Sequence, residues 1–137
     1  MAKNYSQLNI GDRAFVEKTI SETDVYLFAG ITGDFNPAHV NEEAMKKSKF
    51  GGRIAHGMLS AGFISAVIGM QLPGPGSIYL SQSLQFRGPV KIGDTLKAEV
   101  IVVEKLEKGR IRLQTICSIQ DGTVVVEGEA VVIAPRE

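Results

Sequence analysis

The second half of the chain alternates between apolar and polar residues in four runs, a pattern typical of half-buried strands. The runs are SIYLSQSLQF at residues 77–86, DTLKAEVIVVEKLE at 94–107, RIRLQTICSIQ at 110–120 and TVVVEGEAVVI at 123–133. They are separated by the turn sequences GPVKIGD, KG and DG. We therefore predict four antiparallel strands, joined by an earlier one near residues 13–18.

Residues 57–72 have a different pattern, because they are almost entirely apolar or small. Only two serines and one glutamine interrupt the run, and a Pro-Gly pair stops it. Its length predicts a helix. No face of this helix is charged, so we expect other elements to enclose it rather than leave it on the surface.

Two shorter helices are predicted closer to the amino terminus. Ser21 and Asp24 resemble a capping box, which predicts a short helix over residues 21–30. Asn41 is a candidate N-cap for a helix over residues 42–48, whose acids come first and whose lysines come last, as the helix dipole favours. Between them the sequence GDFNP predicts a turn.

Together these elements predict an α+β fold. A chain of 137 residues has the size of one domain, and about two-thirds of its unfolded surface can be buried on folding. The sequence contains no internal repeats, linkers or low-complexity segments. A long central apolar helix wrapped by a curved antiparallel β-sheet suggests a single hot-dog domain over residues 1–137.

The composition gives no reason to expect a nucleic-acid partner. Hydrophobic residues make up 44% of the chain, and 15 basic side chains balance 15 acidic ones, as in a soluble globular protein. Lys46, Lys47 and Lys49 cluster, but Glu42 and Glu43 precede them. A solvated helix face is therefore favoured over an anion contact.

Cys117 is the only cysteine, so the chain cannot form an internal disulfide. One cysteine and two histidines are also too few soft ligands for a structural zinc site. Cys117 lies in the alternating run IRLQTICSI, so a buried strand residue is favoured over a nucleophile. The amino-terminal sequence lacks the apolar core of a signal peptide, and no stretch of about 18 apolar residues could cross a bilayer. We expect a cytoplasmic protein with no membrane partner.

The candidate chemistry is concentrated in the segment FAGITGDFNPAHV, residues 28–40. Asp34, Asn36 and His39 lie within six residues there, around a turn-forming proline. The only other histidine, His56, follows sixteen residues after the segment. Both histidines of the protein therefore flank one short region, which indicates one reactive pocket.

These residue types suit the addition of water to a carbon–carbon double bond conjugated to a thioester. A carboxylate at Asp34 can accept from water, and a neutral imidazole at His39 accepts or donates according to its tautomer. Backbone N–H groups at the helix start after His56 have no partner within the helix and could hold the thioester oxygen as it becomes enolate-like. Gly57 has no side chain to block a ligand there.

Each residue also has a purely structural interpretation. Asp34 and Asn36 are common turn formers that bond their own backbone, and a lone His39 is more often a satisfied, half-buried side chain. For His56 we favour a structural role, as a cap or a packing residue beside the helix. Ser65 on an apolar helix usually bonds to a carbonyl one turn earlier. The functional interpretation depends on the occurrence of these residues together.

Two motifs, TGDFNPAH and GGRIAHGMLSAGFIS, resemble the MaoC-like, (R)-specific enoyl-CoA hydratase family. The resemblance extends through SIYLSQSLQFRGPVKIGDTL and the carboxy-terminal strands, from residue 8 to residue 132. It implies a single hot-dog fold and an active unit that is at least a homodimer, or a higher homo-oligomer. Ala38 is smaller than the branched residue that the family usually places before its histidine.

The resemblance also implies roles for individual residues. Asp34 and His39 would hold and activate the catalytic water, and Asn36 would support the turn. The Gly57 backbone N–H would bind the thioester carbonyl, and Ser65 would lie beside the catalytic pair. These five residues form the predicted site.

The implied activity is reversible syn addition of water to a trans-2-enoyl-CoA, which gives a (3R)-3-hydroxyacyl-CoA. The CoA thioester is the substrate, and no metal or redox cofactor is implied. Three alternatives stay open: a dehydratase acting on acyl carrier protein, a hot-dog thioesterase, and a non-catalytic acyl-thioester binding protein. The predicted long helix lacks the acidic residue that such thioesterases commonly carry. Acyl chain length, pathway, direction and the first proton acceptor are left open.

Overall fold

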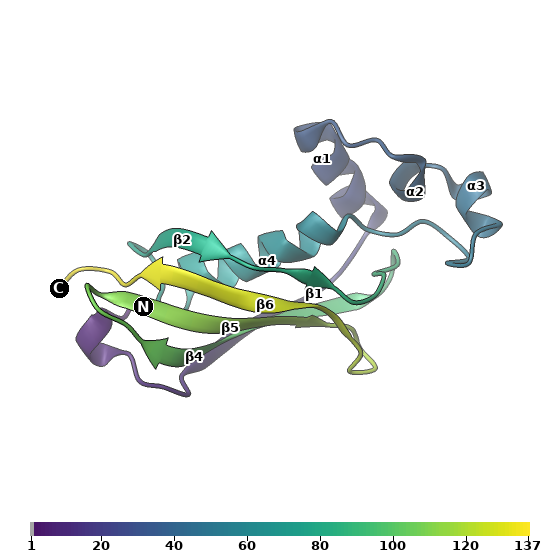
Figure 1. The fold of residues 1–137 in the computed structure, drawn as a ribbon. Helices are drawn as coiled ribbons and strands as arrows, with labels where there is room; N and C mark the ends of the chain where they lie inside the picture. The colour runs from purple at the N-terminus through teal and green to yellow at the C-terminus, as the bar shows by residue number, and fades with distance from the viewer. Residues whose placement is uncertain (1) are drawn as a thin grey trace.

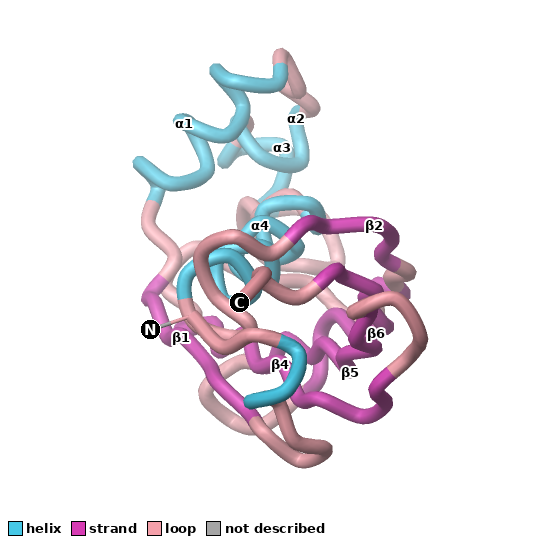
Figure 2. The backbone as a smooth tube through the Cα atoms, turned by 90° about the vertical axis from the view of Figure 1, so that its left-hand side faces the viewer, coloured by secondary structure: helices cyan, strands magenta, loops and turns pink. Residues whose placement is uncertain are grey.

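Six antiparallel strands form one curved sheet that wraps around a long helix, α4 (Gly57–Met70) (Figures 1 and 2). The computed structural model describes residues 2–137. The strands are β1 (Arg13–Thr19), β2 (Ile78–Gln82), β3 (Gln85–Phe86), β4 (Thr95–Lys105), β5 (Arg110–Ser118) and β6 (Val124–Ile133). Their order across the sheet is β1, β4, β5, β6, β2, and the short β3 also pairs with β6. This is the predicted α+β arrangement.

Alternating burial along the central strands builds the core. The inward-facing residues of β4 and β5 are almost completely buried: Leu96, Ala98, Val100, Val102, Ile111, Leu113, Thr115 and Cys117. The Cys117 thiol lies 3.6 Å from the Ser60 carbonyl oxygen on α4, and burial raises the pKa of Cys117 to about 12. The predictions of alternating strands and of a buried strand cysteine are confirmed.

The sheet wraps around one side of α4, so in the single chain the predicted enclosure of this helix is only partial. Ile64 and Val67 are completely buried, whereas Met58 and Met70 are 55% and 70% exposed. The remaining exposed positions on α4 are small: Gly57, Gly62, Ser65 and Ala66. An uncharged pattern therefore indicates an apolar helix, but it does not reveal which face its own chain leaves uncovered.

The strand predicted over residues 77–86 is divided into β2 and β3. Both pair with β6, and Ser83 and Leu84 lie between them. At Gly128 on β6, an added Cβ atom would overlap the carbonyl oxygen of Ser83. The two backbones thus approach so closely at the break that only glycine fits. Alternation within the edge strand gives no sign of this long-range contact.

Residues 21–56, which we call the overhang, project beyond one end of the sheet (Figures 1 and 2). The overhang contains α1 (Glu22–Thr32), α2 (Pro37–Val40) and α3 (Glu42–Lys46). Local signals place two of these helices as predicted, because Ser21 and Asp24 form the capping box of α1 and Asn41 caps α3. The single turn of α2 forms where the sequence predicts only a turn.

The amino terminus begins with a 3₁₀ turn, η1 (Tyr5–Gln7), before β1. The Tyr5 hydroxyl donates a hydrogen bond of 2.8 Å to the carbonyl of Leu106, just after β4. This contact ties the first residues to the sheet. Of the helices within residues 2–137, none combines the length and the apolar character that crossing a bilayer requires.

Candidate active site

Short-range hydrogen bonds shape the GDFNP segment. Gly33 ends α1 in the left-handed conformation, with a φ of 80°, which glycine adopts without strain. The Asn36 N–H donates to Oδ1 of Asp34 at 3.2 Å, and the Ala38 N–H donates to Oδ1 of Asn36 at 2.9 Å. Asn36 is thereby the N-cap of α2, with Pro37 in the first turn. Asn36 supports the turn, and the turn uses Oδ1 of Asp34.

His39 lies on α2 with only 8% of its surface exposed. Its Nδ1 is 2.7 Å from the carbonyl oxygen of Ile54, and because a carbonyl only accepts, Nδ1 carries the proton. In the neutral ring Nε2 then keeps its lone pair. The Ile54 N–H in turn donates to the Ala38 carbonyl at 3.0 Å. These two bonds hold α2 against residue 54 and set the orientation of the His39 ring.

The side chains of Asp34, His39 and His56 come together in space. One carboxylate oxygen and one ring nitrogen of each histidine lie within 4.8 Å of one another. A water that makes hydrogen bonds of about 2.8 Å can bridge such a gap. Asp34 is exposed whereas both histidines are buried, so solvent reaches the group from the carboxylate side. The catalytic roles of Asp34 and His39 stay predictions.

His56 occupies the N-cap position of α4, but its side chain makes no capping hydrogen bond. Its Nε2 instead lies 3.0 Å from the backbone carbonyl oxygen of Asp34. The ring stacks on His39, with centroids 3.7 Å apart and planes 26° apart. The capping interpretation is therefore wrong, and the packing partner is a residue of the candidate site. No local pattern indicates this long-range stacking.

Gly57 begins α4, where the first N–H groups have no partner within the helix. A Cβ atom at this position would lie 2.6 Å from the ring of Phe86 on β3. A larger residue at position 57 would thus have to displace the Phe86 ring. Phe86 is 54% exposed, and nothing in the alternation of residues 77–86 indicates that its ring lies over Gly57.

A cavity of about 520 Å³ opens beside the start of α4. His56 and Gly57 contribute to its wall, which is mostly apolar, and Lys49 and Arg87 are the charged side chains of the lining. Asp34 is not among the lining residues. The cavity therefore adjoins the candidate water site through residues 56 and 57 and offers an apolar space for an acyl group next to it.

Ser65 lies on the exposed face of α4, more than two turns after Gly57. Among residues 2–137, no hydrogen bond or ring contact joins it to Asp34 or His39. The structure of the single chain thus brings four of the five predicted residues into one neighbourhood. The role of Ser65 stays a prediction.

The three clustered side chains have the donor types of a metal site, but the histidines are poorly arranged for one. Each imidazole lone pair lies in its ring plane, and the planes of His39 and His56 are stacked 26° apart. With the ring centroids 3.7 Å apart, the two lone pairs lie in separate, nearly parallel planes, whereas tetrahedral coordination needs them to converge on one ion.

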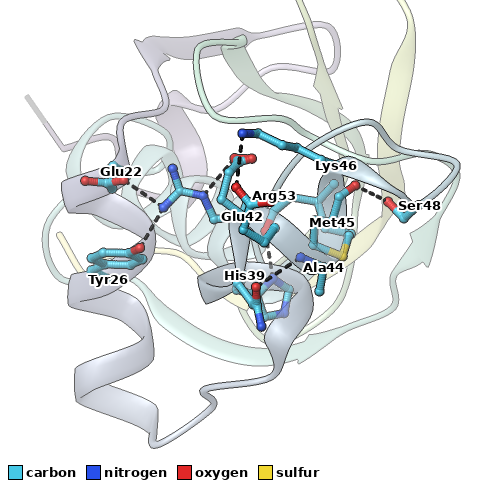
Figure 3. A network of polar contacts seen from close by, with 12 residues as sticks. Glu22, Tyr26, His39, Glu42, Ala44, Met45, Lys46, Ser48 and Arg53 are labelled. Atoms are coloured by element: carbon cyan, nitrogen blue, oxygen red, sulfur yellow. Dashed lines mark hydrogen bonds and ion pairs between the residues drawn. The ribbon is translucent and has the colours of Figure 1, made fainter.

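Arg53 ties the helices of the overhang together (Figure 3). Its guanidinium lies 2.7 Å from Oε2 of Glu22 on α1 and 3.1 Å from Oε1 of Glu42 on α3, and it donates to the Tyr26 hydroxyl at 2.6 Å. Hydrogen bonding to Glu22 makes the largest contribution to raising the pKa of Arg53 above its usual value. Ile54, the residue after Arg53, accepts the hydrogen bond from His39. The Arg53 network therefore also supports the candidate site.

The wrapped helix, together with an acid and two histidines near its start, defines a hot-dog protein of the hydratase and dehydratase class. The unliganded R-hydratase PhaJ1 from Pseudomonas aeruginosa has the same fold, with a TM-score of 0.95 and 48% identity. The match covers 98% of this chain and 86% of that one. The predicted hot-dog fold is confirmed.

Sequence comparison then gives the family. An (R)-specific enoyl-CoA hydratase from Rhodospirillum rubrum is 54% identical over 132 residues, which cover 96% of this chain and 91% of the relative. A mitochondrial 3-hydroxyacyl-[acyl-carrier-protein] dehydratase from Arabidopsis thaliana is 34% identical, over 94% of this chain and 79% of the relative. A family model described as "MaoC like domain" matches residues 10–125. The chain belongs to the MaoC-like dehydratase family.

Proposed function

We propose that this chain is an (R)-specific enoyl-CoA hydratase, a hydro-lyase that adds water reversibly to a trans-2-enoyl-CoA to give a (3R)-3-hydroxyacyl-CoA. The observation that carries the proposal is that the side chains of Asp34 and His39 come close enough for one water molecule to bridge them. It occurs in a chain that shares its fold and 48% of its residues with an R-hydratase.

The proposed chemistry uses the Asp34 carboxylate and the Nε2 atom of His39. A water held between the Asp34 carboxylate and Nε2 of His39 loses one proton to the pair as its oxygen bonds to C3 of the enoyl group. The pair then delivers a proton to C2 on the same face. The hydroxyl added at C3 and the proton added at C2 together make up one water molecule. Because an adjacent acid and base titrate as a coupled pair, the order of the transfers is not assigned to one residue.

The proposed oxyanion donor is the Gly57 backbone N–H. As oxygen bonds to C3, the electrons of the double bond move toward the thioester oxygen, which becomes enolate-like. A donor at the start of α4, supported by the helix dipole, stabilises that charge. One donor to an oxyanion contributes about 3–4 kcal/mol of transition-state stabilisation where this has been measured in acyl-transfer enzymes. The adjoining apolar cavity would take part of the substrate.

We propose that the reaction needs no metal or redox cofactor. Hydration of an alkene changes no net oxidation state, so no electron acceptor enters the balance. A general acid–base pair is sufficient to move the protons, and the stacked histidines are poorly arranged to share an ion. Chelator treatment followed by assay tests this: unchanged turnover is expected, and loss of activity restored by a metal would contradict it.

We propose a homodimer as the smallest active unit. Large hydrophobic residues are exposed on α4 and at the β2 and β3 edge of the sheet: Met58, Met70, Ile78, Tyr79, Leu80 and Phe86. An exposed apolar edge is a surface on which a second chain can pair. Sedimentation analysis of the active protein tests the proposal, and full activity in a monomeric fraction would contradict it.

A spectrophotometric assay with crotonyl-CoA and longer enoyl-CoA substrates tests the proposed reaction. Loss of enoyl absorbance without release of free thiol, together with a 3R product on chiral analysis, is the expected result. Thiol release would indicate a thioesterase instead, and saturable binding without turnover would indicate a binding protein. The same rate series measures the preferred acyl chain length.

A dehydratase acting on acyl carrier protein is the second candidate, because the relative from Arabidopsis thaliana carries that activity in its name. The chemistry would be the same, and only the thiol carrier would differ. The kcat/KM for one acyl group on CoA and on acyl carrier protein separates the two, and we expect the CoA thioester to be preferred. The cytoplasmic location expected from the sequence stays a prediction.

A further inference from the structure

His56 is the most deeply buried side chain of the candidate site, with 3% of its surface exposed. It makes three contacts there. Nε2 bonds to the Asp34 backbone carbonyl, one face stacks on His39, and the Phe28 ring packs at 4.7 Å and a tilt of 50°. One side chain thus touches both members of the proposed catalytic pair, each in a different way.

The hydrogen bonds assign a different tautomer to each histidine. The Asp34 carbonyl accepts from Nε2 of His56, so the proton of His56 is on Nε2. Nδ1 of His56 is buried without a hydrogen-bond partner among residues 2–137, and a proton there would have no acceptor. His39 carries its proton on the other nitrogen, Nδ1, because that atom faces the Ile54 carbonyl.

A packing role alone does not account for this arrangement. An N-cap position favours Ser, Thr, Asp or Asn, whose side chains satisfy the helix N–H groups, and His56 provides no such bond. A purely apolar residue would fill the space without burying an unpartnered ring nitrogen. What histidine adds is a flat ring and one N–H donor, directed at the two proposed catalytic residues.

We propose that His56 is a positioning residue for the hydration reaction. Its Nε2–H holds the Asp34 backbone, and its ring keeps the plane of His39 fixed, so that Nε2 of His39 and the Asp34 carboxylate stay aimed at one water. This inference rests on the proposed function and adds a residue to it. His56 acts through its two neighbours and does not itself exchange a proton with the substrate.

Two substitutions separate the two contacts. His56→Phe keeps a flat ring but removes the donor, whereas His56→Gln keeps an N–H donor but removes the ring. Each is expected to lower kcat by about tenfold or more, because small displacements of reacting groups have effects of that size. KM should change less than kcat, because His56 is only one of the residues that line the cavity proposed for the substrate. Phe28→Leu is the matched control, because it disturbs packing around His56 but leaves both contacts, and its kcat should stay within about threefold.

Proton–nitrogen correlation spectra of the imidazoles give a readout that a merely structural role would not change. The chain has only two histidines, so the two ring systems can be assigned by substitution. In the wild type we expect a fixed Nδ1–H tautomer for His39 and a fixed Nε2–H tautomer for His56. In His56→Gln, which removes the stacking ring, we expect the ring resonances of His39 to shift and broaden. In His56→Phe, which keeps a ring there, they should stay near those of the wild type.

The proposal is overturned if His56→Gln, folded by circular dichroism, keeps both the wild-type kcat and the wild-type ring resonances of His39, or if folded His56→Phe keeps the wild-type kcat. Should neither variant fold, the wild-type spectrum decides: a proton on Nδ1 of His56, or exchange of either ring between tautomers, contradicts the proposal. A different result contradicts the proposed function: a wild-type protein that hydrates no enoyl thioester. The tautomers remain measurable in that case, so the two failures can be told apart.

Discussion

The sheet with α4 and the overhang are held together in different ways. In the sheet and α4, completely buried apolar side chains such as Val100, Leu113 and Ile64 belong to one core cluster. In the overhang each helix buries only one or two side chains, and polar contacts converging on Arg53 join α1 to α3. Apolar burial is strong but not directional, whereas hydrogen bonds add less net stability and fix orientation. The core therefore supplies stability, and the overhang supplies the geometry of the proposed site.

The largest effect on stability is expected in the core. Leu113→Ala should lower the free energy of unfolding by about 2–5 kcal/mol, because it leaves a cavity in a completely buried row. Urea unfolding measures this loss, and kcat per folded molecule should stay near the wild-type value. Gln114→Ala, at an exposed position on the same strand, should change stability by about 0.5 kcal/mol or less. Intact stability with lost turnover in Leu113→Ala would contradict the division of roles.

The opposite result is expected at the proposed catalytic pair. Asp34→Asn and His39→Gln should each reduce kcat by at least about 10²-fold, because each removes one member of an acid–base pair. Thermal unfolding and dimer formation should change little. Asp121→Asn is a suitable control, since this carboxylate lies in the exposed turn between β5 and β6. If either pair variant kept near-normal turnover, the proposed site would be wrong.

Arg53→Met tests the polar network of the overhang. Its guanidinium is only 14% exposed while its acidic partners are more open, so the global loss of stability should be about 1 kcal/mol. Hydrogen exchange should speed up in α1 and α3 but not in the central strands, and kcat should fall about tenfold as the His39 acceptor shifts.

Arg112→Met is the matched control for Arg53→Met. Arg112 pairs with Glu104 across β4 and β5 at 2.9 Å, on the surface of the sheet. Loss of this pair should change neither kcat nor exchange in the overhang. Equal effects of the two substitutions on turnover would show that the overhang network has no special role.

A smaller effect is expected at the capping box of α1. Burial alone would raise the pKa of Asp24, but hydrogen bonds from Lys18 and Ser21 lower it on balance below its ordinary value of 3.8. The stabilisation is therefore complete above that value and is lost as the pH falls through the lowered one. Asp24→Ala should cost about 1 kcal/mol at neutral pH, and the difference from wild type should shrink in acid. A difference that is constant with pH in urea titrations would contradict this.

The smallest effect is expected at Cys117. Burial raises the pKa of its thiol to about 12, so at neutral pH the group is protonated as well as inaccessible. Aromatic disulfide reagents should react with it only after denaturation, in the wild type and in Arg53→Met alike. Rapid reaction in the native Arg53→Met protein would mean that loosening the overhang also opens the core.

The parts of the fold that depend on local interactions could be predicted from the sequence. Ser21 with Asp24 and the N-cap Asn41 satisfy backbone N–H groups within their own turn, so their signals lie in neighbouring residues. The alternation along β4 and β5 reports directly which side chains face the core. The closeness of Asp34 and His39 follows in the same way from one short turn.

The features that the sequence does not reveal depend on contacts between distant segments. His56 contacts His39 only because the start of α4 lies against α2. Phe86 lies over Gly57 only because β3 pairs with β6. The exposed face of α4 is equally nonlocal, since an uncharged helix has the same sequence whether its own chain or another molecule covers it.

Gly128 links the far edge of the sheet to these features. Any replacement there would push the Ser83 carbonyl outward, and β3 with its Phe86 would have to follow, away from Gly57. A substitution at Gly128 would thus alter the surroundings of Gly57 at the start of α4, although no bond joins these two residues. Substitution of Gly128 is therefore expected to disturb the contact of Phe86 with Gly57 at the far end of the same short segment.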